Sequence, residues 1–231
     1  MSENRFDYAV VVFIDILGFR EMVSDDAQST NPRYLPRIID TIHRVREQKT
    51  DTLSIESFSD SVIISAPLSV TSVVAALDTA IKLQRSFVLA DVLVRGGVSF
   101  GKHYNQNNVL FSEALVSAYE HESMHAKVPR IVIDPNMLDW LVNHQDFTPQ
   151  LRTHVNSLLC KDRDNWKFLH YIDDVALHHG VVLRRVKSKI SNPSILEKIR
   201  WLVDYHNHCA RRGGFNGLAI PGFEVVFDDV T

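Results

Sequence analysis

The chain has 231 residues, of which 45% are hydrophobic and 23% charged, as expected for one large globular domain or a domain with an appendage. A formal net charge of -3 argues against the basic surface of a nucleic-acid-binding protein. The 2 cysteines are too few for a disulfide framework, and no apolar run is long enough to cross a membrane. We therefore expect a cytoplasmic protein that binds neither nucleic acid nor a membrane.

The first part of the chain alternates strand and helix patterns. Apolar, β-branched runs predict strands, and apolar residues at helical spacing predict helices. The predicted order is strand 8–16, polar turn 24–32, helix 34–48, strands 53–58 and 61–66, helix 69–90 and strand 92–100. This β-α-β-β-α-β order predicts an α+β fold with a ferredoxin-like core.

The remainder of the chain predicts additions to that core. The predicted elements are a strand near 108–111, a helix near 112–122, strands at 130–133 and 166–171, and a helix over 194–212. We expect residues 1–172 to form the main domain. Residues 173–231 should form a helical C-terminal elaboration that packs on it.

Two aspartates lie at or near the ends of buried strands. Asp15 closes the run from residue 10, and Asp60 separates the strands over 53–58 and 61–66. A carboxylate in such surroundings is costly unless it meets a cation. If the strands are neighbours, both side chains can reach one site. We therefore predict that Asp15 and Asp60 are catalytic carboxylates that hold Mg²⁺ or Mn²⁺, the usual companions of a nucleoside triphosphate.

The turn that follows Asp15 is suited to phosphate oxygens. Gly18 permits a tight turn whose backbone N–H groups can hold phosphate, and Arg20 can add a guanidinium fork. The predicted nucleotide-binding residues are Phe13, Gly18, Phe19, Arg20, Glu56, Phe58 and Arg95.

Residues 13–19 (FIDILGF) resemble the Phe-x-Asp-Ile-x-Gly-Phe motif of the class III nucleotidyl cyclases. Ser59-Asp60 resembles the Gly-Asp of their hairpin, and residues 94–101 and 111–134 resemble their later segments. The resemblance covers about residues 8–172. It implies a nucleotide cyclase domain over 1–172 that works as a homodimer. It also implies two metal ions per site, bridged by Asp15 and Asp60, with the Ile16 carbonyl as a further ligand.

Segments 95–98, 114–120, 168–171 and 198–207 look like the bacterial pyrimidine cyclases of the Pycsar antiphage system. That resemblance implies conversion of UTP or CTP to the 3′,5′-cyclic nucleotide and pyrophosphate. It also implies a role of the product as a second messenger in antiphage defence, where the product would activate a separate effector.

The departures from the class III pattern concern the base and the transition state. Glu56 stands where adenylyl cyclases carry a Lys that binds adenine, and a carboxylate accepts from an N–H edge, which guanine, uracil and cytosine all offer. We favour UTP over CTP because uracil N3–H can donate to Glu56. Val116 and Glu120 match the positions of the family's transition-state Asn and Arg, so another cation must act there. The candidates are Arg20, Arg95, Lys161 and Arg163.

Three other functions compete with a pyrimidine cyclase. A guanylyl cyclase and a catalytically silent nucleotide-binding signalling module would both keep the fold. The segment His121-Glu122-Ser123-Met124-His125 matches the H-E-x-x-H pattern of zinc metalloproteases, in which two His bind Zn²⁺ and Glu122 acts as the base. A metal-dependent assay with nucleoside triphosphates separates these alternatives.

Overall fold

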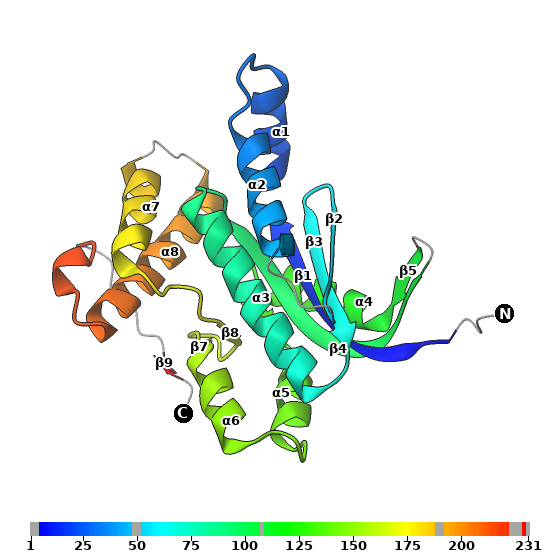
Figure 1. The fold of residues 1–231 in the computed structure, drawn as a ribbon. Coiled ribbons are helices and arrows are strands. Elements are labelled where there is room, and N and C mark those ends of the chain that lie inside the picture. The colour runs from blue at the N-terminus through cyan, green and yellow to red at the C-terminus, as the bar shows by residue number, and fades with distance from the viewer. Residues whose placement is uncertain (1–4, 48–51, 107–108, 188–191, 222–227, 230–231) are drawn as a thin grey trace.

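A computed structural model describes residues 5–47, 52–106, 109–187, 192–221 and 228–229 (Figure 1). The strands are β1 Asp7–Ile16, β2 Ser54–Phe58, β3 Ser61–Pro67, β4 Val94–Gln106, β5 Val109–Ser112, β6 Ile131–Ile133, β7 Leu159–Lys161, β8 Lys167–Leu169 and β9 Asp228–Asp229. The helices are α1 Phe19–Ala27, α2 Tyr34–Glu47, α3 Val70–Leu89, α4 Glu113–His125, α5 Pro135–Val142, α6 Pro149–Ser157, α7 Val175–Lys187 and α8 Pro193–Arg212, with a 3₁₀ turn at Asn216–Leu218. None of the described helices combines the length and apolar character needed to cross a bilayer.

The sheet has the strand order β2-β3-β1-β4-β6-β8-β7-β9, and β5 folds back on β4 as an arm. Strand β1 is antiparallel to both β3 and β4, whereas β4 and β6 run parallel. The first four strands therefore have the ferredoxin-like order that the sequence predicts. The predicted α+β fold class is confirmed.

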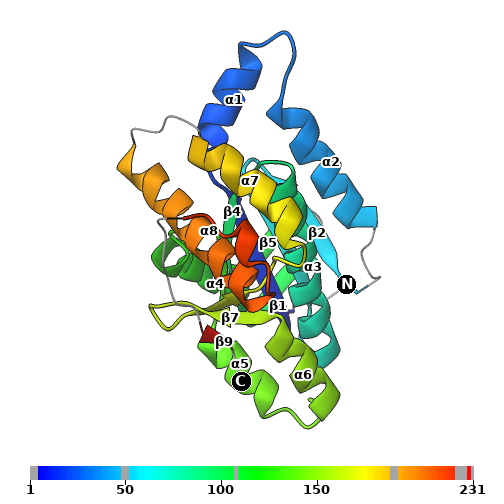
Figure 2. The same ribbon diagram turned by 90° about the vertical axis from the view of Figure 1, so that its left-hand side faces the viewer.

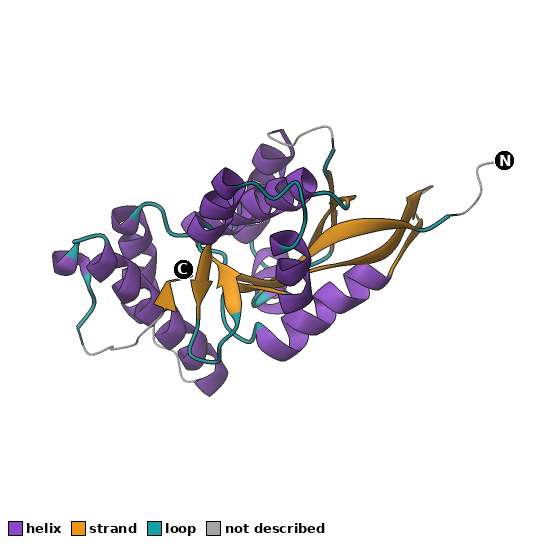
Figure 3. Cartoon of the chain, turned by 90° about the horizontal axis from the view of Figure 1, so that it is seen from below, coloured by secondary structure: helices purple, strands orange, loops and turns teal. Residues whose placement is uncertain are grey.

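Helices cover both faces of the sheet (Figure 3). Val10, Val12 and Ile14 of β1 point to the main core, which includes α3. Val11 and Phe13, which alternate with them, point to α4 on the opposite face. The position of Asp15 on the face of Phe13 follows from the same alternation.

Gly97 lets α4 lie directly on β4. A Cβ atom built on Gly97 would come within 2.1 Å of the Ala118 carbonyl oxygen, a contact that no side chain tolerates. Ala114 and Ala118 face β4 at a spacing of four residues, so the helix side of the contact is also small. This close approach brings Glu122, one turn further along α4, to the end of β1 that carries Asp15.

Several helices were not predicted from the sequence. The polar turn predicted over 24–32 overlaps the end of α1, whose residues are mostly polar and of which Met22 is the buried one. In the structure Asp26 accepts hydrogen bonds from the backbone N–H groups of Arg33, Tyr34 and Leu35, and so caps α2. Helices α5 and α6 begin with Pro after a capping Asp or Thr, a start signal that was present in the sequence.

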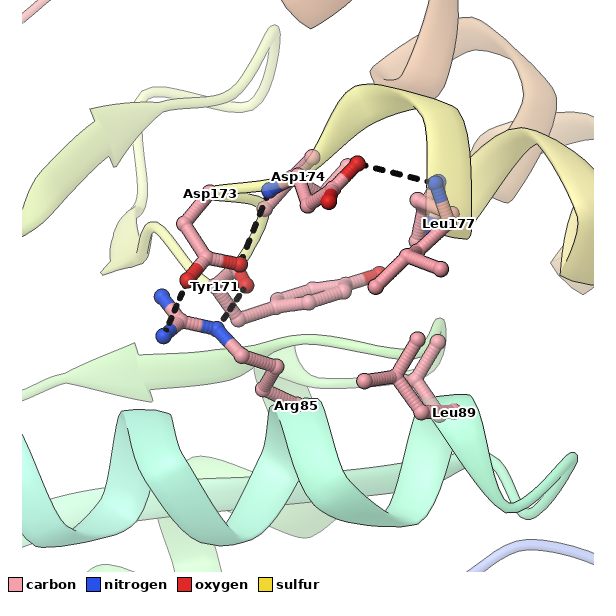
Figure 4. A pocket seen from close by; sticks show the side chains of 9 residues that line it. Arg85, Leu89, Tyr171, Asp173, Asp174 and Leu177 are labelled. Atoms are coloured by element: carbon pink, nitrogen blue, oxygen red, sulfur yellow. Dashed lines mark hydrogen bonds and ion pairs between the residues drawn. The ribbon is translucent and has the colours of Figure 1, made fainter.

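The C-terminal elaboration is tied to the core through Arg85 of α3 (Figure 4). The Arg85 guanidinium donates to the Tyr171 carbonyl oxygen at 3.1 Å and forms an ion pair with Asp173 at 2.6 Å. Asp174 accepts from the Leu177 N–H and thereby starts α7, which packs against α8 (Figure 2). The division at residue 172 stays a prediction.

Histidines fill the contact between α7 and α8. His178 Nδ1 lies 3.1 Å from His206 Nδ1, and His206 Nε2 lies 3.0 Å from the Leu218 carbonyl oxygen. His179 Nδ1 lies 3.2 Å from the same His206 Nε2. A neutral His206 can donate from Nε2 to the carbonyl and accept at Nδ1 from His178. Burial lowers the pKa of His178 to about 3 and also lowers the pKa of His206.

We expect acid to destabilise the protein through this histidine cluster. Because the pKa values of His178 and His206 are depressed in the folded state, the unfolded chain binds more protons below the ordinary histidine pKa of 6.5. The free energy of unfolding should therefore fall as the pH drops below that value. The slope contributed by His178 should approach about 1.4 kcal/mol per pH unit, and His206 should add to the fall in the same direction. Urea titrations from pH 7 to pH 5 measure the slope. A His178→Leu variant should show a smaller slope, and an unchanged slope would contradict the assignment.

Candidate active site

The ends of β1 and of the β2–β3 hairpin lie side by side. The Asp60 carbonyl oxygen accepts a hydrogen bond of 2.9 Å from the Ile16 N–H, and Ser61 is the register partner of Asp15. Ser59 adopts a left-handed conformation with φ 54°, which forms the tight turn. The structure therefore brings the two predicted catalytic aspartates to one end of the sheet.

Arg95 lies between two carboxylates at this end of the sheet. It is the register partner of Asp15 on β4, and its Nε atom donates to Asp15 Oδ2 at 3.0 Å. The same Nε atom lies 2.5 Å from Glu122 Oε1. The Glu122 side chain is 2% exposed, whereas those of Asp15 and Arg95 are 18% and 27% exposed. Arg95, predicted to bind nucleotide, is thus already engaged within the chain.

The site carries more negative than positive charge. Burial raises the pKa of Asp15, and Asp60 adds to the rise, while Arg95 opposes it. Burial raises the pKa of Glu122 to about 7, again against the effect of Arg95 and with additions from Asp15 and Asp60. Asp15 and Glu122 thus share the Arg95 guanidinium, and Asp60 is close enough to add to the negative charge.

This excess of hard oxygen donors fits a divalent cation such as Mg²⁺ or Mn²⁺. The residues that would hold it are Asp15 and Asp60, with the Ile16 carbonyl as a proposed further ligand. In the described residues no three or more His, Cys, Asp or Glu side chains are grouped as a metal cage. An ion there would rely on substrate oxygens for its remaining ligands, as Mg²⁺ commonly does.

The start of α1 offers backbone donors next to the aspartates. Gly18 has φ 79° and is the N-cap residue of α1, with no side-chain cap hydrogen bond to the helix. The free N–H groups of the first helical turn and the positive end of the helix dipole favour an anion. Arg20 is exposed in that same turn. Gly18 and Arg20 therefore lie where a polyphosphate beside the aspartates could contact them.

Glu56 lies on the same face of the sheet, two strands away from β1. Its register partner is Ile63, which packs with Phe13 next to α4. Glu56 Oε1 accepts a hydrogen bond of 3.1 Å from Ser54 Oγ and a second, short one from Asn105 Nδ2 of the β4–β5 arm. The predicted base-binding carboxylate is thus held at the arm, apart from Asp15 and Asp60.

The predicted aromatic residues occupy different surroundings. Phe13 is half-buried and meets Tyr119 of α4 edge to face, with ring centroids 5.6 Å apart. Phe19 lines an apolar groove between α1 and α2 together with Met22. Phe58 is 83% exposed at the hairpin. Of the three, Phe58 is the most exposed, whereas Phe13 and Phe19 are half-buried.

The side chains that could replace the family's transition-state Arg lie in different parts of the fold. Lys161 and Arg163 belong to β7 and the turn after it, three strands away from β4 in the sheet order. The Arg163 guanidinium lies 3.9 Å from Asp204. Arg20 is thus the candidate that is both exposed and next to the aspartates of its own chain.

The H-E-x-x-H segment does not form a common site. His121 Nδ1 lies 2.7 Å from the Ser117 carbonyl oxygen, and His125 stacks on Trp166 at a centroid distance of 4.0 Å. Glu122 is directed instead to Arg95. Both imidazoles lie against Trp166, whereas Glu122 has Arg95 as its partner, so among the described residues the three side chains form no group that could hold zinc.

The sequence matches no protein-family model and no curated protein. The adenylyl cyclase CyaB from P. aeruginosa has a similar structure, with a TM-score of 0.50 and 12% identity over 74% of this chain and 97% of that one. The fold is that of the class III nucleotidyl cyclases. A bacterial light-regulated adenylyl cyclase gives a TM-score of 0.49 at 12% identity, over 78% of this chain and 58% of that one. A class III adenylyl cyclase-like ATP-binding protein from Pseudomonas aeruginosa gives 0.42 at 16% identity, over 58% and 34%.

Two residues that contact predicted site residues, Glu122 and Asn105, are not predicted as such from the sequence. Glu122 follows Ala114 and Ala118 at four-residue spacing on the same face of α4. This spacing is a sequence signal from which its burial against β4 could be predicted. Asn105 carried no local signal, because its contact with Glu56 depends on how the β4–β5 arm curves over the sheet.

Proposed function

We propose that this protein is a nucleotide cyclase that converts UTP to its 3′,5′-cyclic nucleotide and pyrophosphate, with CTP as the second choice. The observation that carries the proposal is that Asp15 and Asp60 lie together beside the first turn of α1, which has no side-chain cap, within a class III cyclase fold. That arrangement provides oxygen ligands for a cation and donors for a polyphosphate in one place.

The chain's own residues would each have a separate task. Asp15 and Asp60 would hold Mg²⁺ or Mn²⁺, which when bound lowers the pKa of the ribose 3′-hydroxyl and offsets the charge of the departing pyrophosphate. The N–H groups after Gly18 would bind phosphate oxygens, and exposed Arg20 would add a charge-assisted contact. Arg95 would hold Asp15 in place through their 3.0 Å hydrogen bond.

Glu56 supports a base with an N–H edge. A carboxylate accepts hydrogen bonds and suits uracil N3–H, whereas cytosine N3 would present a lone pair to it. Guanine also carries an N–H edge, so a guanylyl cyclase is the second candidate, and the fold is equally compatible with it. The resemblance to Pycsar cyclases supports a role in antiphage defence, with a separate effector that responds to the cyclic product.

Incubation of the purified protein with each of the four ribonucleoside triphosphates and Mn²⁺ tests the proposal. We expect cyclic UMP as the main product, identified by mass spectrometry. Cyclic GMP as the main product would support the second candidate. No cyclic product from any of the four would favour a silent nucleotide-binding module.

We expect the active form to be a homodimer, because exposed apolar side chains surround the site. Phe58, Val116 and Tyr119 are 83%, 57% and 53% exposed on the face that α4 covers. An isologous dimer would bury them and could bring Glu56 of one copy toward the aspartates of the other.

Sedimentation equilibrium measures the assembly. The wild type should be a dimer, and Tyr119→Arg should shift it toward a monomer and lower turnover. Leu177→Arg on α7 is a matched control, because Leu177 is 57% exposed away from this face. A fully active monomer would contradict the proposal.

A further inference from the structure

The hydrogen bonds of Glu56 are distributed unevenly between its two carboxylate oxygens. Oε1 accepts from both Ser54 Oγ and Asn105 Nδ2. Each carboxylate oxygen offers about two lone-pair sites, so these donors saturate Oε1. The Asn105 amide must present its nitrogen here, since a carboxylate cannot donate. Oε2 carries no hydrogen bond from any described residue.

The donors lie at the edge of a groove large enough for a nucleoside. Ser54 and Asn105 both line an open groove of about 590 Å³ between the start of β1, the hairpin and the β4–β5 arm. Small-molecule sites typically span about 300–1,000 Å³. His103 and Ser65 are among the other polar residues of the wall. Glu56 itself does not line the groove, but both of its hydrogen-bond donors do, so its carboxylate lies beside the groove wall.

A single open oxygen discriminates between bases. Uracil offers one N–H, at N3, between two carbonyl oxygens. Guanine offers N1–H and the N2 amino group side by side, and both are satisfied only when both oxygens of a carboxylate are free. With Oε1 saturated, one guanine donor would be left without its protein partner, which costs affinity relative to uracil.

We propose that Asn105 is a specificity-determining positioning residue, which occupies Glu56 Oε1 and so favours uracil over guanine. This inference rests on the proposed function, which identifies Glu56 as the base-binding residue. It predicts a change in the ratio of the affinities for uridine and guanosine nucleotides. Asn105 acts through Glu56 and makes no contact with the reacting atoms.

Binding of nucleotides that cannot be cyclised provides the test. The probes are the α,β-methylene analogues of UTP and GTP, measured by calorimetry with Mg²⁺ on the full-length protein. The wild type should bind the uridine analogue more tightly. Asn105→Ala frees one lone pair of Oε1, and the affinity ratio should shift toward guanosine by about tenfold, the effect of one hydrogen bond to a charged group.

Two further variants separate discrimination from a general structural role. Ser54→Ala/Asn105→Ala frees Oε1 completely and should shift the ratio further. Lys102→Ala, at an exposed residue of the same strand, should leave it unchanged. If Asn105 only supported the arm, its loss would lower the affinity for both analogues equally. An unchanged ratio of the two affinities would therefore overturn the inference. Failure of the wild type to bind either analogue would overturn it too. The proposed function fails separately, through the absence of cyclic product.

Discussion

Asp60→Asn is expected to lower cyclic nucleotide formation by at least about 100-fold while the protein stays folded, because it removes one of the two carboxylates that would hold the metal ion. The substitution keeps the shape of the side chain. It also keeps the backbone carbonyl that accepts from Ile16 N–H at 2.9 Å, so the hairpin should remain in place. Initial rates with UTP and Mn²⁺ measure the loss, and thermal unfolding checks the fold.

Asp25→Asn is the matched control for this prediction. Asp25 is an exposed aspartate on α1, close in sequence to the site but outside it. Its replacement should leave the rate within twofold of the wild type. If the Asp60→Asn variant formed product at the wild-type rate, the assignment of Asp60 as a site residue would be wrong.

Arg95→Met is expected to destabilise the protein by about 3 kcal/mol at pH 8, the range seen when one partner of a buried ion pair is removed. Asp15 and Glu122 would then face each other without their cation. Carboxyl groups whose pKa is raised in the folded state bind protons more readily there than in the unfolded chain. The destabilisation should therefore be largest at high pH and shrink as the pH falls to 5, as urea titrations at both pH values can measure.

The double variant Arg95→Met/Glu122→Met tests the cause. Removing both members of the pair leaves no buried charge on α4, and most of the lost stability should return. Activity should stay low, since Asp15 has lost the hydrogen bond that orients it. A single variant as stable as the wild type would show that solvent, rather than Arg95, compensates Glu122.

The order of the core elements could be predicted from local patterns. The β-branched runs that became β1, β3 and β4 and the helical spacing in α2, α3 and α8 follow from residues close in the chain. The position of Asp15 and Asp60 at one end of the sheet also agrees with the sequence, since alternation fixes the face of a strand residue once its neighbour strand is known. Helix α1 is not evident from the sequence because its residues are mostly polar and it is supported by contacts with α2, which are a tertiary effect.

The sequence by itself determined the fold class of this protein and predicted the two aspartates as site residues, because both inferences depend on periodicity and on motifs a few residues long. Only the tertiary structure decided which groups surround them. Arg95 is close to Glu122 because Gly97 and Ala118 allow α4 to approach β4. Asn105 reaches Glu56 because the arm folds back over the sheet. Such contacts join residues 27 and 49 positions apart, and no local pattern encodes them.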